Sequence, residues 1–347
     1  MRVLHAIAGA EFGGAETIAQ DTIAALAEAG VEQHVVTRPW PIATGRFAAM
    51  GVPVTKFGFS RLDSWLRGGA LTDAATEFHA DIVHAWMSRA ASFVTADRPC
   101  PAIGWFGGYY DLKYYRHCDA GFGMTADLVA HIVKGGMPRD RVVEIHSFGT
   151  LDAAPPADRA ALATPSDAPL VLMMARLHEK KGIDTMLHAL ARCPGLYLWI
   201  AGDGPKGAAY RALATKLGLD GRVRFLGWRT DRAALYAAAD MVALPSRYEP
   251  FGTVITEAWA ASRPLIASRA AGAAAYVHDG IDGLLTAIDD VAALAQAMTR
   301  LAQDRPLRDR LVAGGRAAYE SRFTKDAVVT SLLAAYEKIR GLGKRDT

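Results

Sequence analysis

The sequence predicts an α/β protein built from two doubly wound parallel sheets. The chain has 347 residues, too long for one ordinary domain and suited to two of about 150. Short apolar runs typical of buried strands alternate with helical segments along its whole length. Between residues 152 and 169 the composition shifts to Ala, Pro and Asp, which indicates a linker. We therefore expect domains over 1–152 and 169–325, joined by a hinge over 153–168.

Composition excludes several classes of protein. Hydrophobic residues make up 51% of the chain and charged residues 22%, which argues against disorder and allows two cores. The formal net charge is only +3, so we expect no nucleic-acid partner. Residues 1–152 carry 13 basic and 16 acidic side chains, whereas residues 153–347 carry 26 and 20. The second domain is therefore the better site for an anionic ligand.

Cysteine usage and hydropathy bear on location. Cys100, Cys118 and Cys193 show no metal-binding or redox spacing, which suggests free thiols in a reducing compartment. The apolar run at the N-terminus is short and Glu11 follows it, unlike a signal peptide. The sequence contains no stretch of about 18 uninterrupted apolar residues, so we expect no transmembrane helix. We expect a cytoplasmic protein, with peripheral contact to the inner membrane surface left open.

The stretch from Leu244 to Ala260 carries the strongest functional signal. An apolar run ending at Leu244 predicts a buried strand, and a helix is expected to start near Phe251. Glu249 precedes this helix, and Glu257 lies eight positions later, close to two helical turns. Free N–H groups at a helix start attract phosphate. The stretch therefore suits a nucleotide sugar, with two hydroxyl acceptors beside a phosphate site; the alternative is two unrelated surface glutamates.

A second candidate anion site follows the strand predicted from Leu170 to Ala175. Arg176 and Lys181 lie five positions apart across a loop that opens a helix. A guanidinium and an ammonium placed in this way can hold a diphosphate from two sides. A departing phosphate needs such charge as its bond to a sugar breaks. A solvated basic loop is the alternative, and Lys180 is expected to be solvated.

These two stretches resemble a known family. The frame Ser-Arg-Tyr-Glu-Pro-Phe-Gly-x4-Glu-Ala starts at Ser246, and the frame Ala-Arg-Leu-x3-Lys-Gly starts at Ala175. Both are similar to signatures of the retaining family 4 glycosyltransferases of the GT-B fold. The resemblance covers nearly the whole chain and is more specific in its second half. It implies two Rossmann-like domains facing across a cleft, with a C-terminal helix over residues 326–347 that crosses back to the first domain.

The resemblance also implies roles for individual residues. It places Glu249 at the donor sugar, Glu257 at the ribose, and the Phe251–Gly252 backbone at the phosphates. The catalytic residues that it implies are Arg176, Lys181 and Glu249. The donor-binding residues that it implies are Gly13, Gly14, Gly204, Trp228, Arg229, Phe251, Gly252, Thr253 and Glu257. No Asp-x-Asp metal motif is present, which agrees with an enzyme that needs neither metal nor cofactor.

The first domain offers weaker signals. A strand from Val3 to Ala8, a loop containing Gly13 and Gly14, and a helix form a phosphate-binding layout. The strand ending at Trp86 would bring His84 to the ligand-binding edge of its sheet, although a structural histidine is the alternative. Many relatives carry a histidine in the loop after the next strand. Tyr109, Tyr110 or Asp111 would replace it here, so the candidates for the acceptor or sugar side are His84, Tyr109 and Asp111.

Aromatic and basic residues alternate between positions 40 and 67, as on a membrane surface or at an acidic acceptor. Core aromatics beside solvated arginines are the alternative. The aromatic or apolar residues are Trp40, Phe47, Phe57, Phe59, Trp65 and Leu66, and the basic ones are Arg46, Lys56, Arg61 and Arg67.

The function expected is transfer of a hexose-type sugar from a nucleoside diphosphate sugar, UDP before GDP, to an acceptor hydroxyl. The acceptor implied is a glycan or lipid-linked glycan of a bacterial surface polysaccharide or lipopolysaccharide. An epimerase or phosphorylase of the same fold, or a non-catalytic sugar-nucleotide-binding subunit, remains an alternative. A nicotinamide-dependent dehydrogenase would need Gly-x-Gly-x-x-Gly after a strand, which Gly9 to Gly14 does not match.

Overall fold

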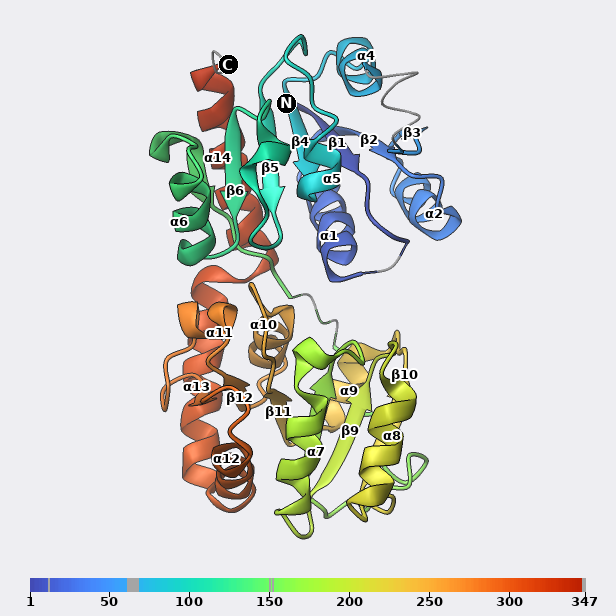
Figure 1. The fold of residues 1–347 in the computed structure, drawn as a ribbon, viewed down its shortest axis with the longest axis vertical. Coiled ribbons are helices and arrows are strands. Elements are labelled where there is room, and N and C mark those ends of the chain that lie inside the picture. Colours follow the sequence, from blue (N-terminus) through green and yellow to red (C-terminus); the bar gives the residue numbers. More distant parts are fainter. Residues whose placement is uncertain (12, 61–68, 150, 152, 345–347) are drawn as a thin grey trace. The chain divides into compact units, whose positions relative to one another are not determined.

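Two compact units make up the structure, a computed structural model (Figure 1). The residues that it describes are 1–11, 13–60, 69–149, 151 and 153–344. Unit 1 comprises Met1–Ser147 and Lys325–Thr347, and unit 2 comprises Phe148–Thr324. Each unit holds one sheet in which every paired neighbour is parallel. The predicted α/β class with two doubly wound parallel sheets is therefore confirmed.

The sheet of unit 1 has the order β3-β2-β1-β4-β5-β6-β7. The chain adds β2 and β3 on one side of β1 and then β4 to β7 on the other side, so the order of strand addition switches sides between β1 and β4. Its strands are β1 (Arg2–Ile7), β2 (Glu32–Thr37), β3 (Val54–Lys56), β4 (Ile82–Trp86), β5 (Ala102–Phe106), β6 (Ala120–Gly123) and β7 (Val142–Glu144). Its described helices are α1 (Gly14–Glu28), α2 (Pro41–Ala49), α4 (Ala70–Glu77), α5 (Met87–Ala91), η1 (Leu112–Tyr115), α6 (Ala126–Lys134), η2 (Arg139–Arg141) and α14 (Lys325–Leu342).

The sheet of unit 2 has the order β10-β9-β8-β11-β12-β13, which reverses between β8 and β11. Its strands are β8 (Leu170–Met174), β9 (Tyr197–Ala201), β10 (Val223–Gly227), β11 (Met241–Leu244), β12 (Leu265–Ser268) and β13 (Leu284–Thr286). Its helices are η3 (Glu179–Lys181), α7 (Ile183–Ala191), α8 (Gly207–Lys216), α9 (Arg232–Ala238), α10 (Thr253–Ala260), α11 (Ala271–Tyr276), α12 (Val291–Gln303) and α13 (Arg305–Arg322).

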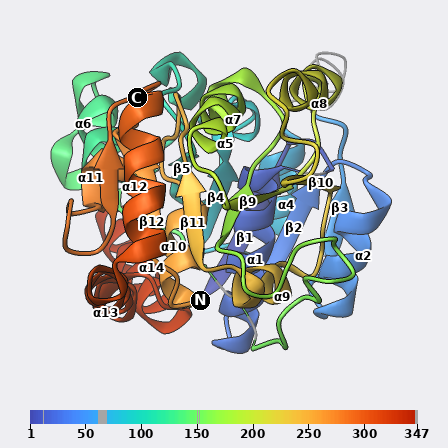
Figure 2. The same cartoon turned by 90° about the horizontal axis from the view of Figure 1, so that it is seen from below.

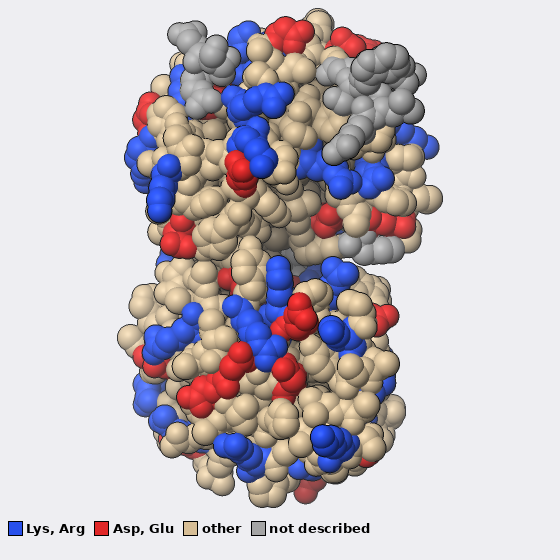
Figure 3. Space-filling view, viewed as in Figure 1, with Lys and Arg blue, Asp and Glu red and all other residues tan. Residues whose placement is uncertain are grey.

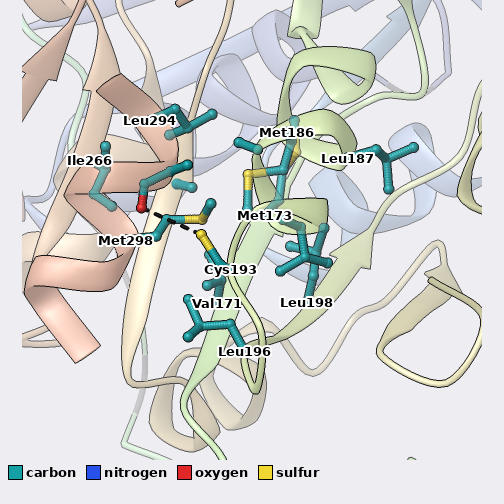
Figure 4. Close-up of a cluster of buried hydrophobic side chains, with 14 of the residues drawn as sticks. Val171, Met173, Met186, Leu187, Cys193, Leu196, Leu198, Ile266, Leu294 and Met298 are labelled. Atoms are coloured by element: carbon teal, nitrogen blue, oxygen red, sulfur yellow. Dashed lines mark hydrogen bonds between the residues drawn. The ribbon is translucent and has the colours of Figure 1, made fainter. Parts of the chain in front are cut away.

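Apolar side chains from both layers fill one face of this second sheet. Helices α7, α8 and α12 lie over it (Figures 1 and 2). Met186, Leu294 and Met298 from these helices pack with strand residues such as Val171 and Ile266 (Figure 4). Strands covered on both faces read as near-continuous apolar runs, which is why β8 and β11 were recognisable in the sequence.

Three aromatic residues of the stretch from 40 to 67 do not lie on the surface that their mixture with basic residues suggested. Phe47, Phe57 and Phe59 are each at most 5% exposed. Phe57 and Phe59 meet edge to face and both contact Phe93 in the same way. The alternative of core aromatics is therefore correct for these three. Arg61, Trp65, Leu66 and Arg67 lie outside the described residues.

Within the described part of the chain, no helix has the length and apolarity needed to cross a membrane.

Two buried histidines occupy the interior of unit 1. His5 on β1 accepts a hydrogen bond from the Trp86 indole at 3.2 Å, and its other ring nitrogen lies 3.0 Å from the Gln33 amide oxygen. This pairing fixes one neutral tautomer. Burial lowers the pKa of His5 to about 3. His84 on β4 stacks on Trp86, and burial also lowers its pKa.

Helix α14 returns to unit 1 at the end of the chain. The Tyr336 hydroxyl lies 2.6 Å from Nδ1 of His84, and the Tyr336 ring stacks near Phe122 of β6. Lys325 at the start of the helix pairs with Glu28 of α1. The His84–Tyr336 and Glu28–Lys325 contacts join residues that are 252 and 297 positions apart. Tyr336 covers the face of β4 that carries His84.

Acidification should therefore destabilise unit 1 selectively. The unfolded chain binds a proton on His5 near pH 6.5, whereas the folded unit resists protonation down to about pH 3. Stability is present above pH 6.5 and falls below it by up to ~1.4 kcal/mol per pH unit for each such histidine. Hydrogen exchange of peptides from each unit, corrected for intrinsic rates, between pH 7 and pH 5 measures this. Unit 2, whose three histidines are not buried, is the internal control, and equal losses in both units would contradict the assignment.

Candidate functional site

The site of unit 2 lies where the strand order reverses. Strands β8 and β11 are neighbours, and their following loops leave from the same carboxyl edge of the sheet. The first loop carries Arg176 and Lys181, and the second carries Glu249. Open α/β sheets bind ligands at this point because the two loops diverge to opposite faces and leave a crevice between them.

A direct ion pair joins the two loops. Nζ of Lys181 donates to Oε2 of Glu249 at 2.6 Å, and the Ser246 hydroxyl lies 3.4 Å from the same oxygen. The Lys181 side chain is 25% exposed and that of Glu249 12% exposed, so the pair is partly shielded from water. Two of the three predicted catalytic residues are therefore in contact, although 68 positions separate them.

Backbone contacts hold the loops at this separation. The Lys180 carbonyl accepts from the N–H groups of Arg247 and Tyr248, at 2.8 and 3.2 Å. Gly182 has φ of 65°, and a Cβ there would collide with the Pro245 carbonyl. Only glycine combines this left-handed conformation with such a close approach. Lys180 itself is exposed, as expected, and its ammonium lies 4.6 Å from the centre of the Tyr248 ring.

Arg247 forms further ion pairs and hydrogen bonds that hold the loop carrying Glu249. Its guanidinium donates to Asp184 and Asp289, both at 2.8 Å, and to the Glu179 carbonyl at 2.7 Å. The Asp184 and Asp289 carboxylates raise the pKa of Arg247, and Arg247 lowers the pKa of Asp289. Arg247 is thus neutralised locally and fixes the segment that carries Glu249.

Arg176 differs from the other cations of this edge. Its side chain is exposed, and no hydrogen bond or ion pair to it occurs among the described residues. The turn containing Gly204 packs against the same loop, because the Leu177 N–H donates to the Asp203 carbonyl at 3.0 Å. A Cβ on Gly204 would lie 2.6 Å from the Leu177 carbonyl oxygen, so glycine permits this approach. Arg176 therefore presents an available positive charge.

Helix α10 begins at Thr253, two residues later than the sequence suggested. Gly252 adopts the left-handed conformation, with φ of 87°, and no side chain caps the helix. Phe251 is buried, and its carbonyl accepts from the Tyr276 hydroxyl, whose pKa burial raises well above 10. Uncapped N–H groups at a helix start favour an anion, so the geometry suits a phosphate here.

Glu257 is not a surface residue of α10. It is 5% exposed, and both carboxylate oxygens accept hydrogen bonds from α9. Arg232 donates to Oε1, and the Tyr236 hydroxyl donates to Oε2 at 2.7 Å. Neither donor was predicted from the sequence. Their spacing of four residues, which places them on one helix face, was the available signal.

Two of the predicted donor-binding residues, Trp228 and Arg229, lie after β10. Trp228 is 65% exposed. Arg229 forms a two-pronged pair with Asp231, at 2.7 and 2.5 Å, which raises the pKa of Arg229. Their role in donor binding stays a prediction.

In unit 1, the glycines after β1 surround a carboxylate. Glu16 on α1 is 8% exposed, and its Oε1 accepts from the Ala10 N–H at 3.0 Å. A Cβ on Gly9 or Gly13 would collide with this carboxylate, whereas Gly14 faces open space. Gly9 and Gly13 therefore have a packing reason, and the phosphate role of Gly13 and Gly14 stays a prediction.

The remaining candidates of unit 1 occupy different environments. His84 is 1% exposed and is held by Tyr336, which favours the structural alternative considered for it. Tyr109 donates to Asp127, and Asp111 caps η1 and pairs with Lys113 at 2.9 Å. That pair lowers the pKa of Asp111. Roles of these three residues toward a sugar or an acceptor stay predictions.

No group of three or more His, Cys, Asp or Glu side chains among the described residues is arranged to hold a metal ion. On the face of unit 2 shown in Figure 3, basic and acidic side chains are interspersed. This pattern agrees with the paired cations found around Lys181 and Arg247.

Comparison with known proteins identifies the family. The family described as "Glycosyltransferase Family 4" matches residues 12–148, and "Glycosyl transferases group 1" matches residues 156–318. The lipopolysaccharide core biosynthesis glycosyltransferase LpsD of Rhizobium meliloti (strain 1021) is 35% identical over 351 residues, covering 99% of this chain and 100% of LpsD. LpsE of the same organism is 34% identical, covering 96% and 98%.

A solved structure agrees with this assignment. HepE from Anabaena, crystallised with UDP and glucose, has a TM-score of 0.85 at 21% identity and covers 97% of this chain and 99% of its own. The chain therefore belongs to the family 4 glycosyltransferases of the GT-B fold, and it is a glycosyltransferase. These matches do not support the dehydrogenase considered from the sequence.

The close contact between Gly272 of α11 and the backbone of Phe251, which is predicted to bind phosphate, can be tested by substitution. A Cβ on Gly272 would lie 2.5 to 2.7 Å from backbone atoms of Phe251. Gly272→Ala should destabilise unit 2 by about 1–3 kcal/mol, although alanine normally stabilises a helix. It should also weaken nucleoside diphosphate binding by at least about tenfold, roughly 1.4 kcal/mol. Calorimetric titration and urea denaturation measure the two effects.

Gly221→Ala is the matched control, because a Cβ there meets nothing within 4 Å. Binding and stability equal to the wild type in Gly272→Ala would show that this approach does not shape the site.

Proposed function

We propose that this glycosyltransferase moves a hexose from a UDP-sugar to a hydroxyl of a lipopolysaccharide core or related surface glycan, with retention at the anomeric carbon. The observation that carries the proposal is the Lys181–Glu249 pair beside the available charge of Arg176, at the edge where β8 and β11 diverge. The names of LpsD and LpsE support the acceptor class, and the UDP and glucose bound to HepE support the donor class.

The proposed reaction requires positive charge that stabilises the departing diphosphate, and it requires no protein nucleophile. The bond between the sugar C1 and the phosphate oxygen breaks, and the acceptor oxygen bonds to C1 on the same face. The acceptor proton passes to the leaving phosphate oxygen. Arg176, Lys181 and the N–H groups at the start of α10 stabilise the charge that develops on the diphosphate. These cations perform the task that a metal ion performs elsewhere, so we propose a metal-independent enzyme.

The ion pair suggests how donor binding is coupled to sugar recognition. Glu249 neutralises Lys181 at 2.6 Å in this structure. A diphosphate drawn in by Arg176 competes for the Lys181 ammonium, because two phosphate charges attract it more strongly than one carboxylate. Glu249 then becomes available to accept hydrogen bonds from the sugar hydroxyls. In this account the diphosphate prepares the sugar site.

We also propose a cytoplasmic location, with peripheral contact to the inner membrane surface through a lipid-linked acceptor. Among the described residues of the aromatic and basic stretch, Phe47, Phe57 and Phe59 are buried and do not contribute to such a contact.

Variants of the pair test the proposed function. Glu249→Gln and Lys181→Met should each lower kcat/KM by at least about 100-fold, because each removes an interaction that strengthens toward the transition state. UDP release from UDP-hexoses with a truncated core oligosaccharide as acceptor gives the rate. Product NMR gives the anomeric configuration, and retention is expected.

Lys180→Met is the matched control for this experiment. Its ammonium rests on the Tyr248 ring, and its loss should change the rate by less than about fivefold. Turnover close to the wild type in Glu249→Gln or Lys181→Met, or an inverted product, would overturn the proposal.

A further inference from the structure

A groove in unit 2 lies outside the site described above. It has a volume of about 580 Å³ and is lined by residues of α8, of β10 and of the turn at 161–163. Strand β10 is the outermost strand of its sheet, and β9 separates it from β8, so the groove does not include the edge between β8 and β11. None of its lining residues has a role in the proposed transfer reaction. Its volume falls within the roughly 300–1,000 Å³ that ligand pockets of proteins occupy.

Two arginines supply positive charge to this groove. Arg224 of β10 donates only to backbone carbonyl groups, among them those of Leu162 at 3.1 Å and Gly221 at 2.9 Å. The Arg211 guanidinium of α8 lies over the Phe225 ring, 4.6 Å from its centre. Neither guanidinium forms an ion pair within the part of the chain that the structure describes. Arg211 therefore brings a charge that is held in place and available to an anion.

A carboxylate and an apolar wall complete the groove. Oδ1 of Asp220 accepts a hydrogen bond from the Thr215 hydroxyl at 2.7 Å, and no ion pair of Asp220 occurs among the described residues. Leu162 and Phe225 line the groove and are half-buried. A guanidinium binds phosphate or carboxylate, a carboxylate accepts from hydroxyls, and apolar side chains cover the C–H groups of a sugar ring. Together these groups match a sugar that carries a negative charge.

We propose that this groove is a second carbohydrate site, which binds an anionic sugar, either a sugar phosphate or a uronic acid. Arg211 binds the anionic group, and Asp220 accepts hydrogen bonds from the ring hydroxyls. The inference does not depend on the proposed function, because no lining residue belongs to the site between β8 and β11. A charged sugar bound here leaves the transfer site open.

A purely structural role for these polar groups is the alternative. The outer strand of a sheet has unpaired backbone groups, which proteins often protect with charged side chains or a covering loop. Arg224 meets this need, because it joins β10 to the carbonyl groups of Leu162 and Ala163. Arg211 does not, because its guanidinium contacts the Phe225 ring instead of the backbone. Substitution of Arg211 therefore tests recognition of a ligand.

The experiment titrates the full-length protein by NMR with glucose, inorganic phosphate, glucose 1-phosphate and glucuronate. At least one of the two anionic sugars should bind at least about tenfold more tightly than glucose, because a guanidinium forms strong hydrogen bonds to an anion. Arg211→Met should weaken this binding at least about tenfold, and Arg211→Lys, which keeps the charge, should restore part of it. Arg310→Met is the matched control. It removes an exposed arginine of α13 that does not line the groove, and it should bind the sugars as the wild type does.

A second variant tests whether the ligand is a sugar or any small anion. Asp220→Ala removes the proposed acceptor for the ring hydroxyls. It should lower the preference for glucose 1-phosphate over inorganic phosphate by at least about threefold. The ratio of the two dissociation constants is the readout, because the loss of one negative charge affects both ligands alike.

Three results would overturn the inference. The first is a wild type that binds neither anionic sugar with a dissociation constant below about 10 mM. The second is binding that survives Arg211→Met but is lost in Arg176→Met, which would place the ligand at the transfer site. The third is an unchanged ratio in Asp220→Ala, which would show a site for small anions of any kind. Thermal midpoints identify any variant that fails to fold, and if Arg211→Met does so, Arg211→Gln decides in its place.

Discussion

The organisation of the site depends on the ion pair between Lys181 and Glu249. It exists because β8 and β11, which are far apart in sequence, are neighbours at the point where the parallel sheet reverses its order. Both loops leave the same edge, so an ammonium on one can meet a carboxylate on the other. The pair holds opposite charges ready in a partly shielded place. In the proposed function, an anionic ligand exchanges partners with this pair, and phosphate binding then releases a carboxylate for the sugar.

The surrounding residues restrict how this pair can move. Gly182 and Gly272 allow backbone segments to approach more closely than a side chain would permit, and Arg247 fixes the loop before Glu249 with two carboxylates. Most of the local cations are thereby already neutralised. Arg176 keeps its charge available among the described residues, and this asymmetry favours the capture of a small anion at one defined place.

The sequence predicted much of the fold and the family. Strands buried on both faces give continuous apolar runs, so β8 and β11 were visible, and the motif residues around them led to the correct family. The start of α10 was placed two residues early because the left-handed conformation of Gly252 cannot be deduced from composition. Contacts between distant segments were also inaccessible. Nothing local indicated that Tyr336 would cover His84. The spacing of Arg232 and Tyr236 places both on one face of α9, but nothing local indicated that they would donate to Glu257 of α10.

The aromatic residues near the start of the chain show the same limit. Alternation of aromatic and basic residues fits a membrane surface and a packed core equally well, because it does not say which side of the sheet each ring faces. The edge-to-face cluster of Phe57, Phe59 and Phe93 belongs to the core. Acceptor recognition is also hard to predict from this sequence, because binding residues often lie on loops whose conformation the sequence pattern does not give.

The most direct test of the account is a thermal-shift panel of the full-length protein with UDP, GDP, ADP, CMP and NAD. A ligand present at 100 times its dissociation constant stabilises the folded state by about 2.7 kcal/mol, enough to move the midpoint measurably. The account predicts a shift with one nucleoside diphosphate, UDP, and none with NAD. A shift with NAD alone, or with none of the nucleoside diphosphates, would contradict the claim that this edge of unit 2 is a nucleotide-sugar site.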